Sequence, residues 1–150
     1  MRFTTVARDA AANAVVDLID AASPGAPGTL EIYSGPRPVS AIIAPSGSNT
    51  LLATLTFSAT AYGASGVAGG NSAGTVVADT ITPATTGVVG GLDATWFRIL
   101  DGNGVVVMDG TILKTGVAGT ADMRLDDIRF VTGATVSISL SSLTMLSTCP

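Results

Sequence analysis

The chain has 150 residues, only 12% of them charged, and a formal net charge of −4 at pH 7. This length suits one domain over residues 1–150, and so few charges fit a protein that packs against copies of itself or a larger scaffold. The seven basic residues are scattered singly, and no apolar run reaches the roughly 18 residues of a spanning helix, so we expect no nucleic-acid partner and no membrane anchor.

A helical period runs through residues 4–22, where Val15, Leu18 and Ile19 fall on one face. Thr4 can cap this helix, and acidic residues inside its apolar part argue against a signal peptide. The following SPGAPG ends the helix, because two prolines and two glycines cannot continue it. The narrow, alanine-rich stripe predicts that the helix lies against a sheet or against a neighbouring chain.

From Thr29 onward the apolar period changes to two. LEIYS (30–34) predicts a short strand that ends at a Gly-Pro turn. LLATLTFS (51–58) alternates cleanly, with Leu51 and Leu55 on one face and Thr54 on the other, which predicts a half-buried antiparallel strand.

Residues 60–92 are close to low complexity, since Gly, Ala, Ser, Thr and Val dominate them. One interpretation is an extended loop followed by a short edge strand in TVVADTIT (75–82). The other is a flexible segment that becomes ordered only against a partner. Both interpretations stay open at this point.

The strongest local signal is ATWFRILDGNGVVVMDGTIL (94–113), in which two strands rich in aromatic and β-branched residues flank DGNG (101–104). The turn residues supply the positive-φ positions of a tight turn, so we predict a β-hairpin. Trp96 and Arg98 share one strand face, and the other face is apolar as well. Trp96 is then either a core residue that packs under the helix or an interface anchor with Arg98 at its rim.

The C-terminal part adds MRLDDIRFV (123–131) and a closing strand in GATVSISLSSLTMLS (133–147). The apolar positions of the closing strand change parity, which implies a bulge or bend near Ser141-Ser142. The lone Cys149 has no partner for an internal disulfide, which leaves a bridge between copies open. Together these elements predict a mainly β fold, an antiparallel β-sandwich of jelly-roll type with one short N-terminal α-helix.

GNSAG (70–74) matches the G-x-S-x-G pattern of serine hydrolases. A serine nucleophile needs a base, and the chain has no histidine, while its single lysine, Lys114, has no Ser-x-x-Lys partner. An enzyme that hydrolyses the bacterial cell wall would need carboxylates positioned at the bond that it cleaves, and Glu31 is the only glutamate in the chain. We therefore expect a protein that is not an enzyme and has no catalytic residues.

Two acidic motifs resemble metal or acid–base sites. DGNGVVVMD (101–109) begins like a calcium loop, but Ile112 stands where the bidentate glutamate belongs, so a hairpin turn explains it better. The second motif comprises Asp122, Asp126, Asp127, Arg124 and Arg129. Because its acids and arginines are interleaved, local ion pairing is the economical interpretation, and we expect no metal and no cofactor.

The order of these pieces resembles small virion proteins of tailed bacteriophages and prophages. The pieces are an AANAVVDLID helix, LEIYSGPRP, LLATLTFS, a Gly/Ala-rich middle, ATWFRILDGNGVVVMDGTI and a Ser/Thr-rich closing strand. The resemblance covers nearly the whole chain and implies a β-rich, non-enzymatic structural protein that works in many copies on a particle. It implies self-association and contacts with other virion proteins, and it carries no site residues over.

The leading functional hypothesis is a capsid decoration or cement protein that binds the shell through the helix or through residues 60–92. The alternative is a tail or tail-fibre module that positions a receptor-binding element or contributes to host receptor binding, although aromatic residues are only 5% of the chain. Either protein would be assembled in the bacterial host cytoplasm and reside in the virion. The candidate interface residues are Val15, Leu18, Ile19, Trp96 and Arg98.

Overall fold

The computed structural model describes residues 3–20, 26–66, 74–87, 90–138 and 142–144. The elements are α1 (Thr5–Asp20), β1 (Thr29–Ser34), β2 (Thr50–Phe57), β3 (Thr75–Val77), β4 (Ile81–Thr82), β5 (Ala84–Thr85), β6 (Leu92–Asp93), β7 (Trp96–Leu100), β8 (Val106–Lys114), β9 (Met123–Leu125), β10 (Arg129–Phe130), β11 (Thr135–Val136) and β12 (Ser142–Thr144). The fold is mainly β with one N-terminal helix, which confirms the predicted fold class.

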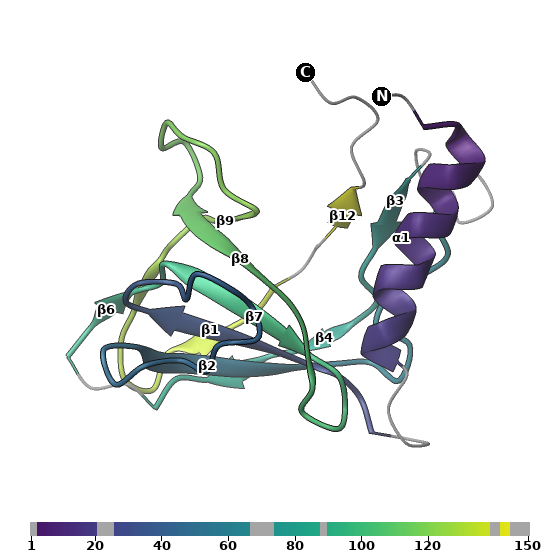
Figure 1. Cartoon of the computed structure of the whole chain (residues 1–150). Coiled ribbons are helices and arrows are strands. Elements are labelled where there is room, and N and C mark those ends of the chain that lie inside the picture. Colours follow the sequence, from purple (N-terminus) through teal and green to yellow (C-terminus); the bar gives the residue numbers. More distant parts are fainter. Residues whose placement is uncertain (1–2, 21–25, 67–73, 88–89, 139–141, 145–150) are drawn as a thin grey trace.

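A curled six-stranded sheet with the strand order β4-β2-β1-β7-β8-β9 forms the body of the molecule (Figure 1). β1 lies between β2 and β7 and is antiparallel to both, so that Ile32 is opposite Ala53 on one side and Phe97 on the other. The other named strands form three two-stranded ladders, β10-β6, β11-β5 and β12-β3.

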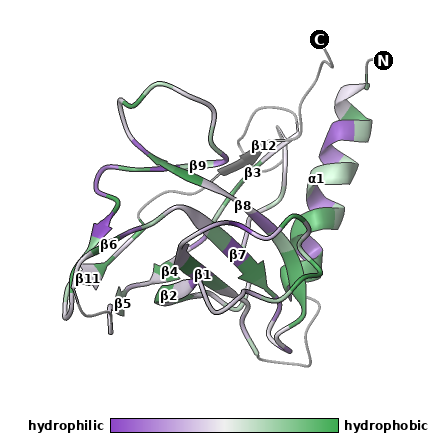
Figure 2. Ribbon diagram, turned by 60° about the vertical axis from the view of Figure 1, so that its left-hand side comes forward, coloured by the Kyte–Doolittle hydropathy of each residue, from purple (hydrophilic) through white to green (hydrophobic). Residues whose placement is uncertain are grey.

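The main core lies on one face of this sheet. Leu30 and Ile32 of β1 and Phe97 and Ile99 of β7 point into it, because alternate residues of a strand share a face. Phe130 of β10 packs into the same core from the short ladders, so the arrangement is sandwich-like, with the curled sheet as one wall. Figure 2 shows the apolar colour concentrated on the central strands. Each fully buried Leu or Ile stabilises the fold by about 1.5–3 kcal/mol.

Helix α1 lies along one side of the molecule (Figure 1). Its N-terminus is capped because the Thr4 hydroxyl accepts a hydrogen bond from the N–H of Ala7 at 3.2 Å. Ala12, Val16 and Ile19 are buried in the main core. The helix begins one residue after the predicted start, and residues 21–22 lie outside the described residues. In the described part of the chain, no helix combines the length and the apolarity that crossing a membrane requires.

The predicted hairpin is confirmed as β7 and β8. The Asp101 carboxylate accepts hydrogen bonds from the N–H groups of Asn103 and Val105, each at 2.8 Å, and so shapes the turn. Gly104 has φ +80°, a conformation that L side chains rarely adopt. β7 is central in the sheet, and Trp96 through Ile99 are all buried.

The expectation of an all-antiparallel sandwich is wrong at one edge, because β9 runs parallel to β8. Parallel neighbours usually need a connection of about a dozen residues or more, whereas residues 115–122 make this one. One guanidinium holds this connection to the end of β8: Arg124 donates to Lys114 O of β8 at 3.3 Å and to two carbonyls of the connection, Val117 O at 2.9 Å and Gly119 O at 2.5 Å.

The described parts of residues 60–92 are paired with the rest of the chain. β4 pairs with β2 at the edge of the large sheet, β5 pairs with β11, and β3 pairs with β12. The edge strand β4 lies within TVVADTIT (75–82), as in the first of the two interpretations. Residues 67–73 and 88–89 lie outside the described residues, as do Ser141 of the predicted bend and Cys149.

Candidate functional site

The sheet face opposite the main core carries an arginine–aspartate cluster of Arg37, Arg98 and Asp109. Arg98 on β7 is opposite Asp109 on β8, and its Nη2 donates to Asp109 Oδ2 at 3.1 Å. Arg37, which follows β1, donates to Asp109 Oδ1 at 3.0 Å. The Arg98 and Asp109 side chains are only 3% and 4% exposed, so two cations share one buried carboxylate.

Two aromatic rings extend this cluster. Tyr33 and Trp96 stack with their centroids 4.3 Å apart and their planes 8° from parallel. The Arg98 guanidinium lies 5.3 Å from the Trp96 ring centroid, within the range of a cation–π contact. The Tyr33 hydroxyl donates to Glu31 Oε2 at 2.7 Å. Burial, with the hydrogen bond and charge of Glu31, raises the pKa of Tyr33 above its ordinary value, so this hydroxyl stays protonated.

The cluster fixes the loop between β1 and β2, residues 35–49, which we call the β1–β2 loop. Arg98 Nη2 also donates to the carbonyl of Ile43 at 3.0 Å. At the base of the loop, Asn49 Nδ2 donates to the carbonyl of Pro36 at 2.7 Å. Prolines at positions 36, 38 and 45 restrict the backbone further. The β1–β2 loop is therefore a long loop with a defined conformation.

This loop presents apolar side chains to solvent. Val39 is 96% exposed and Ile42 is 92% exposed, and their neighbour Ile43 is partly exposed. We call these three residues the apolar loop tip. Surface loops are ordinarily polar, and apolar side chains gathered on one surface mark interaction sites.

The polar groups of this cluster bind one another and the β1–β2 loop. Both Asp109 oxygens accept hydrogen bonds from arginines, so this carboxylate is not a free base. Arg98 Nη2 binds both Asp109 Oδ2 and the carbonyl of Ile43. The arrangement therefore holds a loop in place.

Trp96 and Arg98 lie together, as their shared strand face predicted. Trp96 has no exposed area, but it is absent from the main core and packs on the opposite face, with Tyr33 and Arg98. The helix does not cover it, because the α1 residues belong to the core on the other side of the sheet. Neither side chain offers an open surface to a partner.

The three predicted helix residues occupy different environments. Ile19 is buried in the main core, Val15 is half-buried, and Leu18 is 54% exposed. Of these three, Leu18 is the one that a partner can reach.

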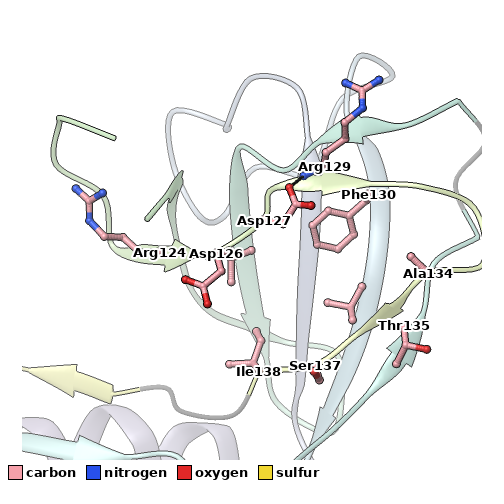
Figure 3. Close-up of a pocket in the computed structure, with 11 residues that line it drawn as sticks. Arg124, Asp126, Asp127, Arg129, Phe130, Ala134, Thr135, Ser137 and Ile138 are labelled. Carbon is pink, nitrogen blue, oxygen red and sulfur yellow. Dashed lines mark hydrogen bonds between the residues drawn. The ribbon is translucent and has the colours of Figure 1, made fainter. Parts of the chain in front are cut away.

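A pocket of about 470 Å³ lies between β9, β10 and β11 (Figure 3). Phe130 and Ile138 contribute apolar surface to it, and Asp126 and Asp127 line it as well. The Arg129 guanidinium points away from Phe130 in Figure 3. The pocket therefore combines apolar surface with two carboxylates, and the chain has no histidine to act with them.

Among the described residues, the guanidinium groups of Arg124 and Arg129 form no ion pair with Asp126 or Asp127, although the backbone N–H of Arg129 donates to Asp127 Oδ1 at 3.1 Å. Arg124 donates to loop carbonyls, and Arg129 Nη1 lies 3.5 Å from Asp93 Oδ1 on β6. Asp122 Oδ2 accepts hydrogen bonds from the N–H and the hydroxyl of Thr111 at 2.8 and 2.9 Å. The backbone hydrogen bond is the main reason that the pKa of Asp122 is lowered. The described residues hold no group of three acidic, His or Cys side chains that could bind a metal ion.

Two sequence motifs remain, the calcium-like motif and GNSAG. The Asp101 carboxylate of the calcium-like motif accepts two backbone hydrogen bonds within its own turn. Ser72 of GNSAG lies outside the described residues.

Arg37, Asp109 and the apolar loop tip were not identified from the sequence. A signal for the loop tip was present: between Pro38 and Pro45, where turn chemistry predicts polar residues, the sequence reads VSAIIA.

Comparisons with protein-family models, with curated proteins and with solved structures give no match for this chain.

Proposed function

We propose that this chain is a non-enzymatic structural protein of a bacteriophage particle, a decoration or cement protein that binds the capsid shell in many copies. The observation that carries the proposal is the apolar loop tip, Val39, Ile42 and Ile43, on a loop fixed by a buried ion pair. The sequence resemblance to small virion proteins supports the same class.

A fixed loop favours binding. Ordering a mobile loop at an interface costs free energy, and the hydrogen bond from Arg98 to Ile43 O has already ordered this one. Val39 and Ile42 can then enter apolar pockets between shell subunits as preformed anchors.

The charge distribution identifies the chemistry of the surface that this loop fits. No charged residue occurs between Arg37 and Asp79, so the whole β1–β2 loop beyond Arg37 is neutral. Its partner surface is therefore expected to be apolar and uncharged. Shell binding should persist in about 1 M salt, where the Debye length falls to about 3 Å.

The alternative is a tail or fibre module that contributes to host receptor binding, and modules that bind carbohydrate usually present exposed aromatic and polar side chains. All seven aromatic residues lie in the described part of the chain, and only Phe3 is largely exposed. Burial of Trp96 and Tyr33 thus favours the shell over a carbohydrate-binding tail role.

The copy number in purified particles tests the proposal. Quantitative mass spectrometry against the major capsid protein should give about one copy per capsid subunit or a simple lattice fraction of it. A handful of copies per particle would instead favour the tail module, and absence from the particles would exclude both functions.

The loop is tested by the double variant Val39→Ser/Ile42→Ser in a co-sedimentation assay with shells. We expect shell affinity to fall roughly tenfold or more, since two apolar anchors are removed. The matched control is Val105→Ser/Val117→Ser, which changes two exposed valines in the loops at either end of β8. If both variants bind as the unmodified chain does, the loop is not the shell-binding surface.

A further inference from the structure

Three polar side chains of helix α1, those of Asp9, Asn13 and Asp20, are turned toward other segments of the chain. Asp9 Oδ1 accepts a hydrogen bond from Gly74 N at 2.5 Å, and Asn13 Oδ1 accepts one from Ser65 N at 2.9 Å. Asp20 Oδ1 accepts a hydrogen bond from Ala61 N at 2.9 Å. The inner flank of the helix is thus occupied by polar contacts that a surface helix would ordinarily present to water.

The outer side of the helix is apolar instead. Val6, Ala10, Ala14 and Leu18 are spaced four residues apart and form one ridge, and all four are exposed, Val6 by 75% and Leu18 by 54%. Along α1, which the structure describes in full, Asp17 is the only charged residue on this exposed side. Figures 1 and 2 show α1 at the margin of the molecule.

The order of sizes along this ridge is the same from both ends: a large side chain, two alanines, and a large side chain. A second copy in antiparallel orientation would therefore place Val6 beside Leu18 of the other copy and Ala10 beside Ala14. The alanines let the two helix axes approach to the short end of the usual 8–10 Å range, while the larger side chains fill the ends. A surface that is complementary to itself in this way fits a two-fold dimer.

Charge complementarity selects the same orientation. The first turn of α1 has no acidic residue and its last turn has no basic one, so neither end of the helix dipole is compensated by a side chain of the opposite sign. In an antiparallel pair, Asp17 of one copy would lie beside the positive N-terminal end of the other helix. A parallel pair would bring the two Asp17 carboxylates together, which is unfavourable.

We propose that the outer face of α1, formed by Val6, Ala10, Ala14 and Leu18, is a two-fold interface between two copies of this chain with antiparallel helices. A helix of about 24 Å offers less than the roughly 800 Å² per partner of a standard interface, so the pair is weak in solution. On a capsid lattice, shell binding would hold two copies close together, and the resulting high effective concentration would let this weak helix contact strengthen shell binding. This part of the inference rests on the proposed function, whereas the dimer itself does not.

Sedimentation equilibrium of the full chain tests the interface over a range of protein concentrations. We expect a reversible monomer–dimer equilibrium, and Ala14→Glu should weaken it at least tenfold, because the substitution places a charge at the centre of the interface. The control is Ala118→Glu, the same change at an exposed alanine of the β8–β9 loop. A chain that stays monomeric throughout, or a dimer that Ala14→Glu leaves intact, would overturn the proposal.

Cysteine cross-linking tests the orientation in a Cys149→Ser background. A mixture of Val6→Cys and Leu18→Cys chains should form mixed disulfides much faster than either chain alone. Rapid disulfide formation by Val6→Cys alone would indicate parallel helices and contradict the proposed arrangement. Because the shell assay uses the β1–β2 loop and these tests use α1 in the absence of shells, failure of one proposal is distinguishable from failure of the other.

Discussion

The Arg98 guanidinium and the Asp109 carboxylate lie 3.1 Å apart on neighbouring strands, and both side chains are buried. The same Arg98 nitrogen also binds the carbonyl of Ile43, which belongs to a different part of the chain. A buried ion pair of this kind contributes little net stability compared with an apolar pair of the same shape. Its effect here is to fix where the β1–β2 loop lies on the sheet.

Replacing Asp109 with Ala should destabilise the protein by about 3–5 kcal/mol, because the Arg98 charge would stay buried without its partner. The free energy of unfolding from urea titration checks this expectation. The double variant Arg98→Met/Asp109→Leu should recover much of the loss, since it removes both charges. If the double variant is no more stable than Asp109→Ala, the uncompensated charge is not the cause.

Gly110 tests how tightly β8 packs against β7. A Cβ atom at this position would lie 2.6 Å from Phe97 Cε1 and 2.8 Å from Asp122 Cβ. We expect Gly110→Ala to destabilise the protein by about 1–3 kcal/mol through overpacking. The control is Gly47→Ala, where nothing lies within 4 Å of the added Cβ. Equal melting temperatures for the two variants would contradict the packing seen around Phe97.

The strands that the sequence predicted best are those whose signal is local. Period-two alternation predicted β1, β2 and the β7–β8 hairpin to within a residue or two, because pleating depends on neighbouring residues alone. The same alternation placed Trp96 and Arg98 on one face. The bond between Arg37 and Asp109 joins residues 72 positions apart, and no local pattern contains that pairing.

The helix shows why its contact residues were harder to predict. The periodicity rule assumes that polar side chains face water, which would place Asp9 and Asn13 outside. Here both residues bind backbone N–H groups of Gly74 and Ser65, so a polar flank packs inward and an apolar ridge faces out. The sequence predicted the apolar stripe of the helix. It did not predict that Asp9 and Asn13 would bind a distant segment, and that contact leaves Leu18 exposed.

Asp122 should make the β8–β9 edge sensitive to acid. The hydrogen bond from Thr111 N–H lowers the folded-state pKa of Asp122 below its ordinary value of 3.8. The carboxylate therefore stabilises the fold above that ordinary value, and its contribution is lost as the pH falls through the folded-state pKa. Carboxyl carbon shifts in an NMR titration should give a midpoint below 3.8.

The lowered pKa of Asp122 also predicts how a substitution at this position changes the stability of the protein. Asp122→Asn should lower the free energy of unfolding at neutral pH by only roughly 0.5 kcal/mol, because solvent screens an exposed carboxylate. The difference between the two proteins should shrink in acid. A difference that grows as the pH falls would mean that protonated Asp122 is the stabilising form, contrary to its hydrogen bonds.

Asn13 should control how firmly the segment 61–66 is attached to α1. Replacing Asn13 with Ala removes the acceptor for Ser65 N–H, and the amide hydrogen of Ser65 should exchange with solvent at least several-fold faster. Global stability should change little, because alanine is the better helix former and offsets part of the lost hydrogen bond. Hydrogen exchange followed by NMR separates these two effects. Asp17→Asn, on the outer side of the same helix, serves as the control and should leave Ser65 exchange unchanged. If Ser65 exchanges equally slowly in both variants, the hydrogen bond from Ser65 N–H to Asn13 does not hold this segment against α1.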